Sequence, residues 1–250
     1  MSYFETTPGA DQTYRAEKQH RIEALAGDEA FRRLSNEWRA LALDRKYMNN
    51  FSWWSRPVIQ LPGDMVAMQE IVLTVKPDLI VECGVAHGGA LVMYASLLQL
   101  LGKGEVVGVD IEIRPHNRAA IEAHPMAGRI SLIEGSSIDL ATAARVREKA
   151  AGSSVVLVCL DSNHTHQHVL RELELYAPLV TSGSYCVVFD TFIEDMPDDF
   201  VWKDRPWGKG NNPKTAVHAF LRQRPEFEID RSIEDRVVVT SAPDGFLRRK

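Results

Sequence analysis

The sequence predicts an α/β domain with a mostly parallel, doubly wound sheet. Short apolar, β-branched segments alternate with segments of helical length, an order that places helices on both faces of parallel strands. The first strand begins at Leu79 and runs through a glycine-rich turn into a long apolar helix at 90–101. Further strands are expected at 105–109, 129–133, 155–160 and 185–189, with helices at 117–123, 140–151, 167–176 and 214–222. Two last strands, at 227–230 and 237–240, are expected to close the sheet as an antiparallel pair.

Residues 1–63 are expected to form an N-terminal helical and aromatic extension, and residues 64–250 the main domain. Apolar residues at helical spacing predict one or two amphipathic helices in the extension: Ile22, Leu25, Phe31, Leu34, Trp38, Leu41 and Leu43. We expect this apolar stripe to dock on the main domain. A substrate lid, or a contact between the subunits of a homo-oligomer, is the alternative. Asp64 is expected to cap the N-terminus of a helix at 65–75.

The composition limits the classes of partner. The chain has 250 residues and a net charge of −5, which argues against a general nucleic-acid binder with a basic face. No apolar run is long enough to cross a membrane, and residues 1–20 are polar, so neither a membrane span nor a signal peptide is expected. Cys83, Cys159 and Cys186 lie in apolar, strand-like runs, which is typical of buried free thiols in a reducing cytoplasm.

The turn after the first strand indicates a nucleotide site. Gly84 lets the backbone turn before a helix N-terminus, and Gly88 and Gly89 let a ligand approach without meeting a Cβ. Three residues separate Gly84 from Gly88, which is not the Gly-x-Gly-x-x-Gly spacing of dinucleotide sites. Glu82 would repel a pyrophosphate but attract an ammonium or sulfonium group, and S-adenosylmethionine (SAM) carries both. An ordinary tight strand-to-helix turn is the alternative.

Carboxylates are expected to converge at one edge of the sheet. Three strands end in Asp110, Asp161 and Asp190, and ligands of such sheets bind beyond the carboxyl ends of the strands. Together with Glu82, these residues place four carboxylates on one rim. Asp110 is positioned to accept the ribose hydroxyls of a nucleoside, unless it caps a helix or a turn. The third strand is followed by small polar residues that are placed to border an adenine ring, Ser136 and Ser137.

Histidines follow the fourth strand. His164 and His168 have the spacing of zinc ligands on a helix. Asp161 and Asp190, however, offer oxygen ligands, which favour Mg²⁺, Ca²⁺ or Mn²⁺ over zinc. Exposed polar histidines at the start of a helix are the simpler interpretation of His166 and His168.

Several motifs together resemble one known family. They are Glu82-Cys83-Gly84-Val85-Ala86-His87-Gly88-Gly89, Gly108-Val109-Asp110-Ile111 with Arg114-Pro115-His116-Asn117, Asp161-Ser162-Asn163-His164-Thr165-His166, and Pro57-Val58-Ile59-Gln60-Leu61-Pro62. In these motifs, from about Tyr47 to Ala216, the sequence is similar to the cephalosporin hydroxylase family. The resemblance implies a Rossmann-like class I SAM-dependent methyltransferase fold. Members and relatives of the family include sugar and antibiotic O-methyltransferases that use Mg²⁺.

The resemblance also implies roles for individual residues. The turn that holds the methionine part of SAM would consist of Glu82, Gly84, Ala86, His87, Gly88 and Gly89. Asp110 would bind the ribose, and Ser136 and Ser137 would lie near the adenine. Asp161 and Asp190 would be metal ligands. Related metal-dependent enzymes have an acid pair after the fifth strand where this chain has Asp190 followed by Thr191. The third ligand is therefore open, with these candidates: Thr191, Glu194 and Asp195. A metal-free enzyme is the alternative.

His164 matches the position where related enzymes keep a catalytic base, next to the catalytic Asp161. An alcohol deprotonates too reluctantly at pH 7 to attack a methyl sulfonium unaided, so it needs a base and preferably a metal ion. Imidazole titrates in the right range, near pH ~6.5 when unperturbed.

The leading hypothesis is a SAM- and Mg²⁺-dependent O-methyltransferase acting on a sugar or another polyhydroxylated natural product. A non-catalytic SAM-binding partner of a tailoring enzyme is the first alternative. An NAD-dependent oxidoreductase is the second, although the glycine spacing disfavours it. The aromatic segment 51–54 and the loop 195–213, with Trp202 and Trp207, are expected to wall the acceptor pocket.

Overall fold

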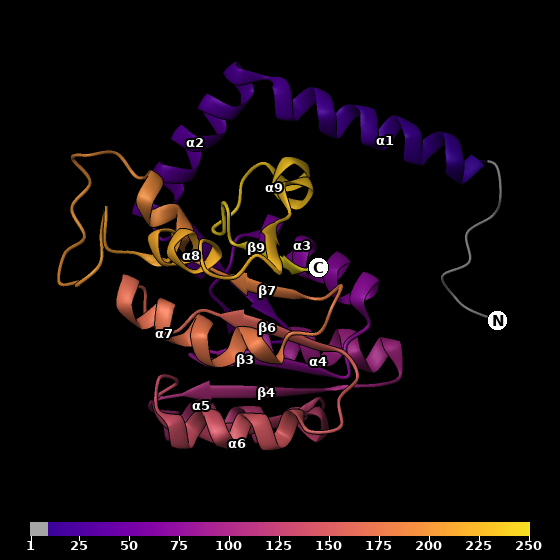
Figure 1. Cartoon of the computed structure of the whole chain (residues 1–250), viewed down its shortest axis with the longest axis vertical. Coiled ribbons are helices and arrows are strands. Elements are labelled where there is room, and N and C mark those ends of the chain that lie inside the picture. Colours follow the sequence, from indigo (N-terminus) through magenta and orange to yellow (C-terminus); the bar gives the residue numbers. More distant parts are fainter. Residues whose placement is uncertain (1–9) are drawn as a thin grey trace.

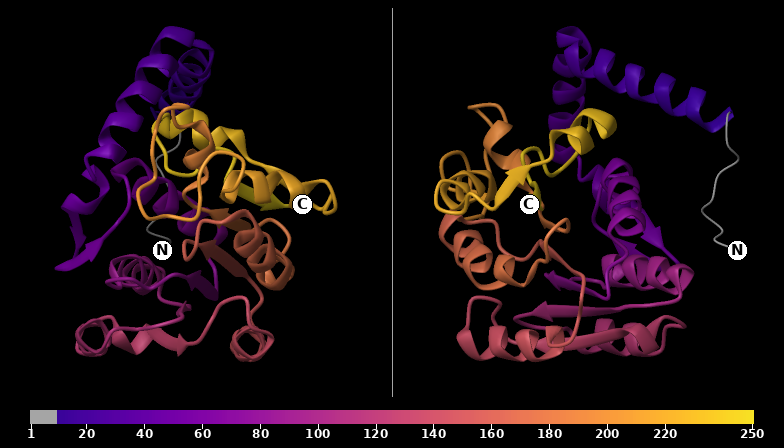
Figure 2. Two further views of the ribbon diagram at one scale, coloured as in Figure 1. Left: turned by 90° about the vertical axis from the view of Figure 1, so that its left-hand side faces the viewer. Right: turned by 45° about the vertical axis from the view of Figure 1, so that its right-hand side comes forward.

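The structure is a computed structural model that describes residues 10–250, and residues 1–9 of the expected extension lie outside this range. The described chain forms a seven-stranded sheet with helices on both sides (Figures 1 and 2). The order of the strands across the sheet is β5-β4-β3-β6-β7-β9-β8. Their bounds are β3 Leu79–Cys83, β4 Glu105–Asp110, β5 Ile130–Glu134, β6 Val156–Leu160, β7 Tyr185–Val188, β8 Phe227–Ile229 and β9 Phe246–Arg249.

All neighbouring strands are parallel except the pairs that β9 makes with β7 and β8. The chain leaves β3 toward β4 on one side and returns to β6 on the other. This reversal between β3 and β6 is the topological switch point, where α/β sheets bind their ligands. The predicted doubly wound sheet with an antiparallel closing strand is thus confirmed.

Two layers of helices cover the sheet, and their bounds are α3 Pro62–Val75, α4 Gly89–Leu101, α5 Pro115–Glu122, α6 Leu140–Ala150, α7 His166–Tyr176, α8 Pro213–Leu221 and α9 Arg231–Val237. Alternate residues of β3 point to opposite faces, as strand geometry requires. Ile80 packs in the cluster formed with α3, α4, α5 and α9. Val81 packs in the cluster formed with α6, α7 and α8. Because β3 is buried on both faces, its sequence is apolar throughout, with Glu82 as the exception.

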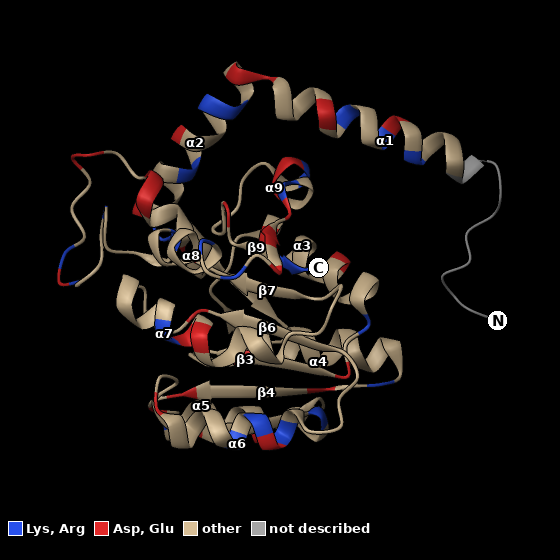
Figure 3. Ribbon diagram, viewed as in Figure 1, with Lys and Arg blue, Asp and Glu red and all other residues tan. Residues whose placement is uncertain are grey.

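The N-terminal segment contains two helices that project from this body (Figure 1). They are α1 Ala10–Gly27 and α2 Glu29–Asp44, and both carry charges of either sign along their length (Figure 3). Asp28 caps α2 by accepting a hydrogen bond from the backbone of Phe31 at 2.9 Å. The 3₁₀ helix η1 Tyr47–Asn50 and a short hairpin of β1 Phe51–Trp53 and β2 Arg56–Val58 lead into α3. The boundary at residues 63 and 64 stays a prediction. Across residues 10–250, every helix is too short or too polar to cross a bilayer.

Two predictions near this region are wrong. The helix α3 begins at Pro62 with Leu61 as its N-cap, so Asp64 lies inside the first turn. Its buried carboxylate accepts hydrogen bonds from Thr240 Oγ1, and from the backbone N and Oγ of Ser241 at 2.9 and 2.7 Å. The β-branched run 237–240 does not form a strand. Val237 is the last residue of α9, and the rest of the run leads to Thr240 and the following Ser241, which donate to Asp64. The strand that closes the sheet is Phe246–Arg249.

Candidate active site

The site lies at the carboxyl ends of the central strands. Backbone hydrogen bonds tie these ends together: Asp161 N donates to Cys83 O at 2.8 Å, and Gly84 N donates to Val109 O at 2.8 Å. On the other side of β6, Phe189 N donates to Leu160 O at 3.0 Å. The segments that follow β3, β4, β6 and β7 therefore start from one rigid edge, as the predicted convergence of carboxylates requires.

The glycines of the turn after β3 make room for the chain's own atoms. Gly84 has φ +106°, and a Cβ there would lie 2.2 Å from the carbonyl oxygen of Asp161. A Cβ on Gly89 would lie 2.1 Å from the carbonyl oxygen of Pro57, and one on Gly88 would lie 2.4 Å from Ile121. The expectation that Gly88 and Gly89 admit a ligand is wrong on the side where a Cβ would stand, because protein atoms fill that space.

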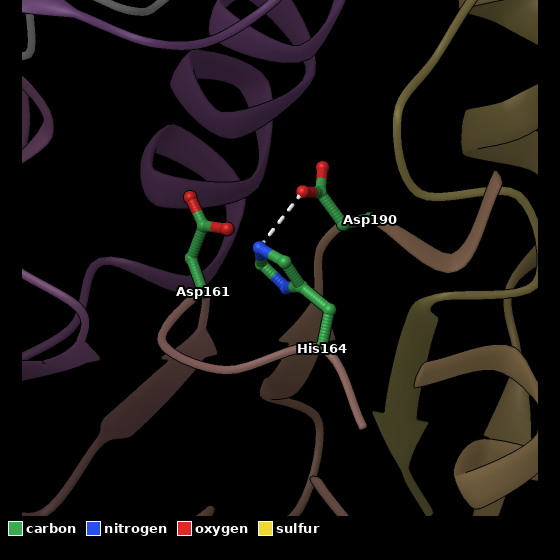
Figure 4. A group of neighbouring side chains, drawn as sticks. All are labelled: Asp161, His164 and Asp190. Carbon is green, nitrogen blue, oxygen red and sulfur yellow. Dashed lines mark ion pairs between the residues drawn. The ribbon is translucent and has the colours of Figure 1, made fainter. Parts of the chain in front are cut away.

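Asp161, His164 and Asp190 form one cluster at this edge. One ligand atom from each lies within 4.8 Å of the others, and the three side chains point toward one another (Figure 4). His164 Nε2 is 3.1 Å from Asp190 Oδ2, and these two side chains are 16% and 17% exposed. Burial, together with the negative charge of Asp190, raises the pKa of Asp161 well above its usual value. Burial also raises the pKa of Asp190, and His164 opposes that rise.

A divalent cation fits this donor set. The carboxylate oxygens of Asp161 and Asp190 suit Mg²⁺ or Mn²⁺, and a cation between them would offset both the cost of burying the two charges and their mutual repulsion. Asp190 also has a left-handed backbone, with φ +57°, a conformation that is concentrated at functional sites in residues other than glycine.

The candidates for a third ligand are engaged elsewhere. Thr191 Oγ1 donates to Pro243 O at 2.6 Å. Glu194 accepts hydrogen bonds from Gly210 N and Asn212 Nδ2. Asp195 pairs with Lys214 at 2.8 Å and with Arg39 at 3.6 Å. His164 is the third member of the cluster, and its role as a base stays a prediction.

The zinc pair of His164 and His168 does not form. The helix α7 begins at His166, so His164 precedes it and the spacing of four residues no longer places both rings on one helix face. His168 Nε2 lies 3.1 Å from Ser137 Oγ and 3.4 Å from Glu172. His166 Nδ1 lies 2.8 Å from Thr215 Oγ1. The ring of His168 therefore links α7 to the segment after β5, and the ring of His166 links α7 to α8.

A cavity of about 350 Å³ opens beside the cluster. Its lining contains all three cluster residues and these predicted cofactor residues: Glu82, Gly84, Ala86, His87 and Gly89. Trp207 also lines it, and its ring meets that of His164 edge to face at 4.7 Å between centroids. Trp202 instead packs against Phe200. The expectation for segment 51–54 is wrong, because residues 57–60 line the cavity, while Trp53 donates to Ser96 and Trp54 is 71% exposed.

A second cavity of about 240 Å³ adjoins the first and shares Gly84, Ala86 and Asp161 with it. It contains the remaining predicted cofactor residues except Gly88: Asp110, Ser136 and Ser137. Asp110 Oδ2 accepts hydrogen bonds from Val85 N at 2.8 Å and Ala86 N at 3.3 Å. The carboxylate of Asp110 thus fixes the glycine turn and also faces the second cavity, so both of its predicted roles are compatible with its position.

Two residues that the sequence did not single out support the larger cavity. Arg56 Nε donates to the carbonyl oxygen of His87 at 3.0 Å and so holds the glycine turn. Gln60 is 2% exposed and lines the cavity. Gln60 lies in the segment 57–62 that resembles the family, and its position between two prolines was the only signal available for it.

Comparison with known proteins identifies the family. The model of the Rhamnosyl O-methyltransferase/CmcI family matches residues 45–250. The chain belongs to this family. Rhamnosyl O-methyltransferase of Mycobacterium tuberculosis (strain ATCC 25618 / H37Rv) is 33% identical over 193 residues, covering 75% of this chain and 73% of the relative. The Mycobacterium leprae (strain TN) enzyme of the same name is 30% identical over 207 residues, covering 81% and 84%.

Solved CmcI structures share the fold at low sequence identity. The CmcI-N160 apo-structure superposes with a TM-score of 0.57 at 18% identity, covering 80% of this chain and 76% of that chain. The structure of cmcI-D160 with Mg and SAM gives a TM-score of 0.56 at 18% identity, covering 81% and 77%. The resemblance and the methyltransferase fold drawn from the sequence are thereby confirmed. The same family membership confirms the enzyme class, a SAM-dependent O-methyltransferase.

Proposed function

We propose that this Rhamnosyl O-methyltransferase/CmcI family member transfers the methyl group of SAM to a hydroxyl group of a sugar or of a glycosylated, polyhydroxylated natural product. The observation that carries the proposal is the cluster of Asp161, His164 and Asp190 between two adjoining cavities. The names of the curated relatives support a sugar as the acceptor.

The two cavities bind opposite ends of the methyl donor, SAM. The adenosine end of SAM occupies the smaller cavity, where Asp110 binds the ribose and Ser136 and Ser137 border the adenine. The methionine end would occupy the larger cavity, beside Glu82 and the turn residues Ala86, His87 and Gly89. Because the cavities meet at Gly84 and Asp161, the sulfonium and its methyl group come to lie near the cluster.

The cluster prepares the acceptor oxygen. Asp161 and Asp190 would hold Mg²⁺, and the bound cation would make the acceptor hydroxyl more acidic. His164 takes the hydroxyl proton at Nε2, and the carboxylate of Asp190, 3.1 Å from that nitrogen, stabilises the imidazolium that forms. Trp207, packed on His164, forms one wall of the acceptor space and keeps water from the imidazole. The enzyme otherwise acts by holding oxygen, methyl carbon and sulfur in line.

The test uses the purified full chain with SAM, Mg²⁺ and a panel of glycosides that includes rhamnosides. We expect a methylated glycoside and S-adenosylhomocysteine in equal amounts by mass spectrometry, and loss of both when the metal is chelated. Absence of SAM binding by calorimetry would refute the proposal. SAM binding without turnover of any acceptor on the panel would favour the non-catalytic partner.

We further propose that the protein is a homo-oligomer of the cytoplasm. Phe31, Leu34, Trp38 and Leu41 are between 41% and 57% exposed, and their spacing of three and four residues places them on one face of α2. Light scattering on the wild type and on Leu34→Glu with Leu41→Glu tests the association, which the two changes should abolish. The three buried cysteines are free thiols, which is typical of a reducing compartment.

A further inference from the structure

Three polar side chains at the inner end of the larger cavity bury atoms that have no hydrogen-bond partner. They are Gln60, Glu82 and Tyr94, which are 2%, 1% and 0% exposed. The atoms without a partner are Gln60 Nε2 and Oε1, Glu82 Oε2 and Tyr94 Oη. Buried polar groups in folded proteins are nearly always paired, so a group of unpaired atoms needs an explanation.

The three residues come from different elements and meet at one place. Gln60 precedes α3, Glu82 lies one residue before the end of β3, and Tyr94 lies on α4. Burial raises the pKa of Glu82, and the Tyr94 hydroxyl beside its carboxyl opposes that rise; Gln60 lies next to the same hydroxyl. Gln60 and Glu82 also line the cavity, whereas Tyr94 lies behind them. A ligand in the cavity would therefore lie against the two residues that carry these buried, unpaired atoms.

The chemistry of these atoms defines what they can bind. A glutamine amide offers two N–H donors on one side and an acceptor oxygen on the other. A carboxylate beside it is a further acceptor. An amino-acid zwitterion needs this combination: acceptors for its ammonium group and a donor for its carboxylate. A second acidic residue in place of Gln60 would repel both Glu82 and the ligand carboxylate.

We propose that Gln60 is a binding residue for the amino-acid end of SAM, with its Oε1 accepting from the α-ammonium group and its Nε2 donating to the α-carboxylate. Glu82 faces the same ammonium group, and Tyr94 positions Gln60 and Glu82 from behind. The inference rests on the proposed function, which places the methionine end of SAM in this cavity.

The test compares two ligands that differ only at the amino-acid end. S-Adenosylhomocysteine carries the zwitterion, and 5′-methylthioadenosine has the same adenosine and thioether without it. For Gln60→Met, which keeps the length of the side chain and removes its polar atoms, calorimetry should give a Kd for S-adenosylhomocysteine about 10- to 100-fold higher than in the wild type. The Kd for 5′-methylthioadenosine should change less than twofold. The matched control is Gln223→Met at an exposed position after α8, which should change neither value.

Each result separates the alternatives. An equal loss of affinity for both ligands would mean that Gln60 only shapes the cavity, and unchanged affinity for S-adenosylhomocysteine would also overturn its role. If the wild type binds neither ligand, the proposed function fails together with this inference. If the wild type binds both, a negative result for Gln60→Met refutes the inference alone. Should Gln60→Met not fold, Gln60→Glu keeps size and polarity, and it should weaken the binding of S-adenosylhomocysteine selectively through charge repulsion.

Discussion

Asp64 on α3 and Glu82 on β3 are both fully buried acidic residues, yet they differ in the hydrogen-bond partners of their carboxylates. Asp64 is surrounded by donors from the segment before β9, and both of its carboxylate oxygens accept hydrogen bonds. Glu82 faces the larger cavity, and its Oε2 has no partner. Burial raises the pKa of both, to about 6 for Asp64 and to about 8 for Glu82. The hydrogen bonds from Thr240 and Ser241 limit the rise for Asp64.

This difference separates a structural carboxylate from one that is directed at a ligand. The protein supplies every partner of Asp64, so its role is complete in the folded chain. Glu82 keeps one carboxylate oxygen without a partner beside the cavity. The cluster of Asp161, His164 and Asp190 lines the same cavity, and burial raises the pKa of both of its carboxyl groups. Changes at the cavity should therefore alter catalysis and binding, whereas changes at Asp64 should alter stability.

The largest effect is expected for Asp161→Asn. This change removes one of the two carboxylates proposed to hold Mg²⁺ while keeping the size of the side chain. We expect turnover to fall about 10⁴-fold, which corresponds to about 5 kcal/mol, and the response of the rate to added Mg²⁺ to disappear. Asp199→Asn, in an exposed loop, is the control and should keep both. An Asp161→Asn enzyme with an undiminished Mg²⁺ response would place the metal elsewhere.

The second effect is expected for His164→Ala. Loss of the base that takes the acceptor proton should lower turnover about 10³-fold. The affinity for S-adenosylhomocysteine, measured by calorimetry, should stay within twofold, since the donor lies beside His164 without depending on it. His20→Ala on the exposed face of α1 is the control. A parallel loss of turnover and donor affinity would assign His164 to binding.

The sequence predicted the carboxylates at the cavity better than it predicted the hydrogen-bond partners of the buried Asp64. Asp161 and Asp190 were found because parallel strands bring their carboxyl ends to one edge, a rule that needs only the order of the strands. The partners of Asp64 were missed because they lie more than 170 residues away, and because the β-branched run 237–240 has the composition of a strand. Gln60 was missed for a related reason: its importance depends on Glu82 and Tyr94, which only the fold brings next to it.

The third prediction concerns stability and pH. A folded-state pKa raised from 3.8 to about 6 means that the folded protein binds a proton at Asp64 more tightly than the unfolded chain does. This contribution to stability is present below pH 3.8 and is lost as the pH rises through 6, by about 3 kcal/mol in total. Urea unfolding of the wild type and of Asp64→Asn from pH 4 to 7 measures it as the change in their difference. A difference that does not vary with pH would show that Asp64 is ionised in the fold throughout this range.

The smallest effect concerns Glu82 and follows from the same linkage. With a pKa of about 8, Glu82 is mostly protonated at pH 7 in the ligand-free protein. The ammonium group of S-adenosylhomocysteine favours the carboxylate and lowers the pKa of Glu82, so binding at pH 7 should release close to one proton. Calorimetry in buffers of different ionisation enthalpy measures this number.

Two comparisons isolate the source of that proton. Glu82→Gln should release none with S-adenosylhomocysteine, and 5′-methylthioadenosine, which lacks the ammonium group, should release none even from the wild type. Equal release from both ligands would mean that burial of the cavity, and not the ammonium group, shifts the equilibrium. Asp64, which already has its hydrogen-bond partners, should contribute nothing to this proton release, because no ligand reaches it. Proton release that disappeared in Asp64→Asn would therefore remove the distinction between the two carboxyl groups.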